Sequence, residues 1–180
     1  MNELPQSLEP EITLEESPDL VSGRMSELRT WAKEKGVEEV ECHTPDFAGI
    51  ARGKVMPAAK WFTGVQTRLP TSVFFATITG SYADSPHREL WSDADMILQP
   101  DLHTAASLPW ATVPSIQVIH DVLDLDGKPI DFAPRTVLRR VLDQYKDLGW
   151  QPIVAGAATG AVWPDAAHQP GVLHARDRRV

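Results

Sequence analysis

Residues 37–57, VEEVECHTPDFAGIARGKVMP, contain the pattern that decides the fold. Residues 37–42 are a strand candidate, and residues 50–56 predict a second strand. The segment between them holds a proline, an aspartate and a glycine, which are residues that favour a turn. The whole stretch therefore predicts a β-hairpin.

Helices and further strands flank the predicted hairpin. Apolar residues at helical spacing predict a helix over residues 24–35, which Gly36 ends. The clearest helix is predicted over residues 134–148, with one apolar face, before Gly149. The remaining expected elements are a short helix at 57–62 and strands at 72–78, 95–98, 115–123 and 151–155. We therefore predict an α+β fold whose antiparallel or mixed sheet is covered on one face by helix.

Acidic residues are concentrated at the start of the chain. The formal net charge is -8, and no Lys or Arg occurs before Arg24. Several acidic residues and three prolines precede it, which predicts a disordered acidic leader over residues 1–22. Because no basic cluster with interleaved aromatic residues follows, we expect neither nucleic acid nor a membrane surface as a partner. The acidic start and the short apolar runs indicate a cytoplasmic protein.

The usual signatures of a catalytic or metal site are missing from the sequence. It has no Walker-type or dinucleotide-binding glycine loop, and its six histidines are scattered rather than spaced as metal ligands. Asp121, Asp124 and Asp126 are interpreted as residues that flank a strand end and a turn. The single cysteine, Cys42, is predicted to be a small buried residue. We therefore assign no catalytic residue and no metal ligand in this chain.

Two surface features are candidates for interaction. Arg52 and Lys54 alternate to one side of a predicted strand, and two interpretations stay open for them, a solvated basic surface or an interface. The polar loop over residues 80–89 is long enough to indicate a functional role.

Six short motifs occur in order between Val37 and Ala155. They are Val40-Glu41-Cys42 with Pro45-Asp46 and Gly49, Arg52-Gly53-Lys54-Val55-Met56-Pro57-Ala58, Asp93-Ala94-Asp95-Met96-Ile97-Leu98-Gln99-Pro100-Asp101, Thr104-Ala105, the strand to His120-Asp121, and Asp131-Phe132-Ala133-Pro134-Arg135. Taken together they resemble the glutamine synthetase family, particularly the branch that joins glutamate to polyamines or related amines.

The resemblance implies a division of the chain. Residues 23–125 would form the family's amino-terminal β-grasp domain, and residues 126–155 the first helix and strand of its catalytic domain. Where the family continues with metal-binding glutamates, this sequence has Gly156-Ala157-Ala158-Thr159-Gly160. We therefore expect a truncated catalytic domain, and we interpret residues 156–180 as a non-homologous tail for which a frameshift is one hypothesis.

The resemblance also implies chemistry and partners. In the family, ATP phosphorylates the side-chain carboxylate of glutamate, and an amine or ammonia then displaces the phosphate. Mg²⁺ or Mn²⁺ held by glutamates assists that transfer. We expect this chain to hold none of these cofactors by itself. The partners it implies are copies of the chain or full-length glutamine-synthetase-like subunits.

One loop of the amino-terminal domain helps to close a neighbouring subunit's active site in this family. Its counterpart lies within residues 76–91. The candidate residues there are Thr79, Gly80, Ser81, Asp84, Arg88 and Trp91, with Arg52 and Lys54 as a candidate interface on the hairpin. Threonines stand near the position where ammonia-using members carry an acid, and Asp84 is the nearest acidic residue. This departure favours an amine larger than ammonia.

Two hypotheses of function follow. The first is an ATP-dependent ligase of glutamine biosynthesis or nitrogen metabolism, which joins ammonia or a polyamine-like amine to the γ-carboxylate of glutamate. This chain would be an incomplete and inactive amino-terminal fragment of it. The alternative is a non-enzymatic β-grasp module that docks to full-length relatives.

Overall fold

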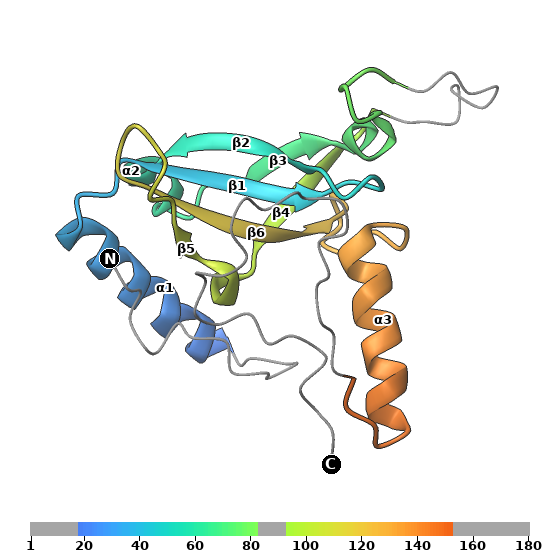
Figure 1. Ribbon diagram of the computed structural model, residues 1–180. Coiled ribbons are helices and arrows are strands. Elements are labelled where there is room, and N and C mark those ends of the chain that lie inside the picture. The colour runs from blue at the N-terminus through green and yellow to red at the C-terminus, as the bar shows by residue number, and fades with distance from the viewer. Residues whose placement is uncertain (1–17, 83–92, 153–180) are drawn as a thin grey trace, which may run out of the picture.

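A mixed β-sheet forms the centre of the protein (Figure 1). The computed structural model describes residues 18–82 and 93–152. The strands are β1 (Glu39–Pro45), β2 (Ala51–Pro57), β3 (Thr67–Pro70), β4 (Asp95–Pro100), β5 (Ala106–Ser107) and β6 (Ser115–Leu123). Their order is β2-β1-β6-β4-β3, and β5 pairs with β6. Only β1 and β6 run parallel among the paired strands described.

Helices lie at the sides of this sheet. They are α1 (Pro18–Glu34), α2 (Ala58–Trp61) and α3 (Pro134–Asp147), together with the 3-10 helices η2 (Thr71–Phe75) and η4 (Leu102–Thr104). In Figure 1, α1 lies along one side of the sheet, whereas α3 extends away from the sheet's end. No helix in the described residues is long and apolar enough to cross a membrane.

The core lies on one face of the sheet, and strand alternation explains which side chains reach it. Every second residue of β1 is buried, and the same alternation holds along β6. Leu28 of α1, Trp61 of α2 and Phe74 of η2 pack against these strands. The sheet residues of this core include Val40, Cys42, Met56, Leu69, Met96, Leu98, Ile116, Val118 and Val122. The predicted α+β fold, with a mixed sheet covered on one face by helix, is confirmed.

The predicted hairpin is confirmed, and both of its strands begin and end one to three residues later than expected. Val40 of β1 pairs with Met56 of β2, and the pairing extends to Pro45 and Ala51. The strand predicted over residues 115–123 coincides with β6. The thiol of Cys42 is fully buried, and burial raises its pKa to about 11, so this side chain behaves as the small core residue that the sequence predicted.

The strand predicted over residues 72–78 is wrong. Residues there form η2, and the sheet takes its edge strand β3 just before them instead. A short apolar run without periodicity does not distinguish a strand from a buried turn of helix. Pro70 ends β3 and lacks a backbone N–H, which fits the end of a strand on the sheet's edge. The 3-10 turn then places Phe74 in the core.

The ends of the chain differ from the prediction in part. Helix α1 begins at Pro18 rather than at residue 24, so residues 18–22 are helical instead of belonging to a leader. Proline suits the first turn of a helix because the N–H it lacks would be unpaired there. Residues 1–17 and 153–180 lie outside the described residues, and so does most of the strand expected at 151–155. The helix predicted over residues 134–148 is confirmed as α3.

Candidate functional site

The 77–81 turn lies where the sequence resemblance places the loop that closes a neighbouring active site. The Thr77 amide donates to the Ser81 carbonyl over 2.7 Å, and the Gly80 amide donates to the Thr77 carbonyl over 2.8 Å. Gly80 has a φ of 85°, a left-handed conformation that glycine adopts without strain. The side chain of Ile78 is 74% exposed at the tip. The turn is thus a tight, projecting structure rather than a loose loop.

The base of this turn is tied to the preceding 3-10 helix. Ala76 and Tyr82 form a β-bridge, and the Tyr82 hydroxyl lies 3.1 Å from the Ser72 hydroxyl. At the tip, the hydroxyl groups of Thr77 and Thr79 are 3.1 Å apart. The tip therefore presents an apolar side chain and hydroxyl groups but no carboxylate.

Arg52 joins the 77–81 turn to the hairpin. Its Nη2 donates to the Thr77 carbonyl over 2.7 Å, and its Nε donates to Oδ2 of Asp46 over 2.8 Å. The Asp46 side chain is fully buried, and its Oδ1 also accepts the amides of Ala48 and Ile50. Arg52 is thus bound within the chain and is not a free surface charge.

The Asp46 carboxyl is ionised in this arrangement. Burial alone would raise its pKa, but hydrogen bonds from Arg52, Ile50 and Ala48 outweigh burial and lower the pKa from its ordinary value. The Arg52–Asp46 pair is therefore a charged, hydrogen-bonded contact at neutral pH.

The structure brings together only some of the residues that the sequence singled out. Thr79, Gly80 and Ser81 lie exposed on the 77–81 turn, beside Arg52. Lys54 points to the same face as Arg52 but is exposed. The other three candidates of the loop, Asp84, Arg88 and Trp91, lie outside the described residues. An interface role for Arg52 and Lys54 stays a prediction.

A cluster of four charges joins α3 to the sheet. Arg135 donates to Asp121 over 2.7 Å and to Asp101 over 2.5 Å, and Arg139 donates to Asp121 over 2.6 Å. Asp121 lies near the end of β6 and Asp124 accepts two amides within the following turn, as interpreted from the sequence, but the ion pairs of Asp121 with α3 were not foreseen. Sequence reasoning missed the cluster because its members come from β6, α3 and the start of η4. The i, i+4 spacing of the two arginines was the available signal.

This cluster does not have the chemistry of a magnesium site. Its two carboxylates are matched by two guanidinium groups, so no net negative charge remains to hold a hard cation. Among the described residues, no group of three or more His, Cys, Asp or Glu side chains is placed to hold a metal ion. We derive no metal-dependent step from these residues.

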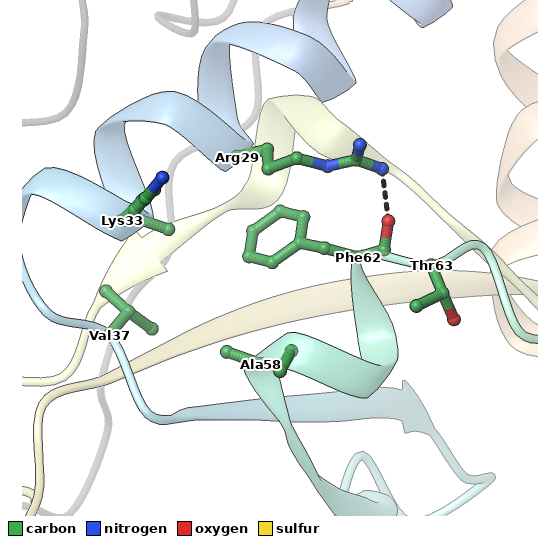
Figure 2. A pocket seen from close by; sticks show the side chains of 8 residues that line it. Arg29, Lys33, Val37, Ala58, Phe62 and Thr63 are labelled. Carbon is green, nitrogen blue, oxygen red and sulfur yellow. Dashed lines mark hydrogen bonds between the residues drawn. The ribbon is translucent and has the colours of Figure 1, made fainter.

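A pocket of about 520 Å³ lies between α1 and α2. Figure 2 shows Arg29 reaching across it to the Phe62 carbonyl, to which its guanidinium donates a hydrogen bond. Ala32, Val37 and Ala58 supply apolar lining. The pocket has a basic rim but no acid–base pair. No residue of the 77–81 turn lines it.

Replacing Arg135 with glutamine should loosen α3. No residue of α3 is buried, so its position depends strongly on the four-charge cluster. We expect a loss of about 2 kcal/mol in the free energy that holds α3 in place, because charged hydrogen bonds to two carboxylates disappear. Hydrogen exchange of the α3 amides measures this loss.

The matched control is Arg140→Gln on the same helix. The Arg140 pair with Asp131 is exposed, so its removal should lower the same free energy by less than about 0.5 kcal/mol. Equal exchange in both variants would contradict the prediction.

Comparison with known proteins identifies relatives of this domain. No protein-family model matches the chain. A glutamate–isopropylamine ligase of a Pseudomonas species is 23% identical over 129 residues, covering 69% of this chain and 28% of the ligase. A glutamine synthetase of Thermotoga maritima is 44% identical over 62 residues, covering 33% of this chain and 14% of that protein. Lengsin of Mus musculus is 27% identical over 141 residues, covering 74% and 24% respectively.

Solved structures give the same result. A glutamine synthase homologue matches with a TM-score of 0.53 and 27% identity, over 62% of this chain and 27% of that chain. GmaS, solved in complex with ADP, matches with a TM-score of 0.50 and 30% identity, over 67% of this chain and 26% of that chain. The mixed sheet and its covering helices therefore define an α+β domain that glutamine synthetase homologues share. The chain is a homologue of the glutamine synthetase family, as its motifs predicted, and spans less than a third of the length of these relatives.

Proposed function

We propose that this chain supplies the amino-terminal domain of an ATP-dependent ligase that joins an amine to the γ-carboxylate of glutamate. The observation that carries the proposal is the projecting 77–81 turn on a domain shared with glutamine synthetase homologues. In this proposal the turn closes an active site on a neighbouring catalytic domain. ATP and Mg²⁺ or Mn²⁺ would be held by that catalytic domain rather than by the described residues. The cytoplasmic location predicted from the sequence is part of the proposal.

The chemistry of the turn supports an amine larger than ammonia. Ammonium is a small cation that a carboxylate would attract, yet residues 77–81 contain no acid. The exposed side chain of Ile78 and the hydroxyl groups of Thr77 and Thr79 suit an amine that carries an alkyl body. The name of the Pseudomonas relative specifies isopropylamine, which is such an amine. We therefore propose an alkylamine or polyamine as the substrate of the assembled enzyme.

A second candidate function is a non-enzymatic module that docks to full-length relatives. The observation that favours it is the apolar face of α3, which is exposed over Val137, Leu138 and Val141 and continues to the exposed Leu148 just after the helix. An apolar face of this extent is a candidate contact surface for another protein. In this alternative the chain regulates or blocks a related enzyme instead of completing one.

Purified alone, the chain should not catalyse ligation. We propose that it is incomplete and inactive by itself, since the described residues provide no carboxylate cage for a divalent cation. The measurement is release of phosphate from ATP with glutamate, isopropylamine or spermidine, and Mg²⁺ or Mn²⁺. A rate that depends on both glutamate and amine would contradict the proposal. The matched positive control is the Pseudomonas ligase under the same conditions.

Co-purification distinguishes the two candidates. The chain is mixed with a full-length glutamine-synthetase-family subunit and analysed by size-exclusion chromatography. Binding that lowers the activity of the full-length subunit favours the docking module. Binding that shifts its preference from ammonia toward isopropylamine favours the ligase domain. A monomeric chain that never associates would count against both.

A further inference from the structure

Three turns of this protein share one backbone geometry. They cover residues 46–50, 77–81 and 124–128. In each, the amide of the first residue donates to the carbonyl of the fifth, over 3.0, 2.7 and 2.8 Å respectively. The fourth residue is a glycine with positive φ, whose amide donates back to the carbonyl of the first residue. This pattern is a type I turn followed by a left-handed glycine.

The first side chain distinguishes the 77–81 turn from the other two. Oδ1 of Asp46 accepts the amides of Ala48 and Ile50 over 2.9 and 2.8 Å. Oδ1 of Asp124 accepts the equivalent amides, those of Asp126 and Lys128, over 2.9 and 2.8 Å. An aspartate at this place stabilises the turn internally. In the 77–81 turn the first residue is Thr77, which has no carboxylate. That turn therefore lacks the two hydrogen bonds from backbone amides to a carboxylate that brace the other two turns.

Arg52 provides a brace from outside the turn. Its guanidinium binds the Thr77 carbonyl and Oδ2 of Asp46 at the same time, and Oδ2 is the oxygen that the 46–50 turn leaves available. A Cβ atom on Gly80 would lie 3.9 Å from Nη1 of Arg52, so the guanidinium also lies alongside the glycine of the 77–81 turn. The planar fork of arginine makes both hydrogen bonds possible at once, which an ammonium group cannot match.

We propose that Arg52 is a positioning residue, which holds the 77–81 turn against the 46–50 turn and so presents Ile78 and Thr79 as one rigid contact to the neighbouring catalytic domain. The contact with a neighbouring catalytic domain rests on the proposed function, whereas the bracing of the turn does not. Arg52 does not touch a substrate in this role. It acts through the backbone of Thr77.

Arg52→Lys tests the brace in the full chain. Lysine keeps the charge beside buried Asp46, so the fold should survive, but a single ammonium cannot reach both partners. We expect the Gly80 amide to exchange with solvent at least about tenfold faster, while the amides of β6 keep their rates. An unchanged rate at Gly80 would overturn the proposal. A uniform rise at Gly80 and in β6 would also overturn it, because it would assign Arg52 to general stability.

Thr77→Asp provides the rescue. Added to Arg52→Lys, it introduces the aspartate that braces the two sister turns, and we expect the slow exchange of Gly80 to return. Failure of this rescue would contradict the bracing role.

Affinity for a full-length glutamine-synthetase-family subunit, measured by calorimetry, tests whether the braced turn is presented to a neighbouring subunit. Weaker binding of Arg52→Lys than of the wild type supports rigid presentation, and equal binding overturns it. Absence of binding by both chains rejects the proposed function, while the exchange data still decide the brace.

Discussion

Replacing Gly53 with alanine is expected to destabilise the protein by at least about 3 kcal/mol, because the added methyl group meets a backbone that cannot move aside. A Cβ atom on Gly53 would lie 1.8 Å from the Cys42 carbonyl oxygen and 2.8 Å from its carbonyl carbon. Gly53 lies opposite His43 in the β1–β2 pairing, so relief requires the two strands to separate. Urea unfolding at neutral pH measures the loss.

Gly23→Ala is the matched control for this prediction. Gly23 lies in α1, and a Cβ atom there would meet no atom within 4 Å. Alanine is the better helix former, so this variant should be stabilised by up to about 1 kcal/mol. A Gly53→Ala protein that unfolds within about 1 kcal/mol of the wild type would show that the hairpin absorbs the methyl group.

Stability should fall by about 3 kcal/mol between pH 6.5 and pH 4 because the folded state keeps His120 neutral in that range. The side chain is fully buried on β6, beside Trp61 with ring centroids 6.5 Å apart. Burial lowers its pKa from 6.5 to about 4, and the hydrogen bond to the Val118 carbonyl offsets this in part. Above pH 6.5 the ring is neutral in both states. Below it, the unfolded chain binds a proton that the folded chain excludes, so the folded state loses stability as the pH falls.

The test measures the free energy of unfolding at several pH values in this window. His120→Leu removes the titrating group from the core and should lose most of the pH dependence. His43→Gln removes a half-buried histidine of the opposite sheet face and should retain it. Equal slopes for the wild type and His120→Leu would assign the effect to other groups.

Periodicity explains how much of the fold was predictable from the sequence. Helix α3 and strand β6 carry clear apolar patterns, and the hairpin carries a turn signature between two strands, so all three were predicted. The run before residue 76 is apolar without a period, and it was assigned to a strand although η2 forms there. Element type is ambiguous where every neighbouring position is apolar.

The candidate site was less predictable, since its contacts join residues that are far apart in the chain. Arg52 meets Thr77 across 25 residues, and Arg135 meets Asp101 across 34. Such pairs depend on strand register and on the position of α3, which no local pattern specifies. The resemblance singled out residues 76–91, and the role of that loop stays a prediction. The structure adds the contact between Arg52 and the Thr77 carbonyl, which the sequence did not indicate.

The two edge strands of the sheet, β2 and β3, influence how this protein can associate with other molecules. Strand β3 is only four residues long and ends in proline, and β2 carries the exposed Lys54 and also ends in proline. Short, charged or proline-ended edges resist the addition of a further strand from another chain. Extension of the sheet from one molecule into the next, the route by which many β-proteins aggregate, is therefore disfavoured here. Association is left to side-chain surfaces, which discriminate among partners far better than an open backbone edge does.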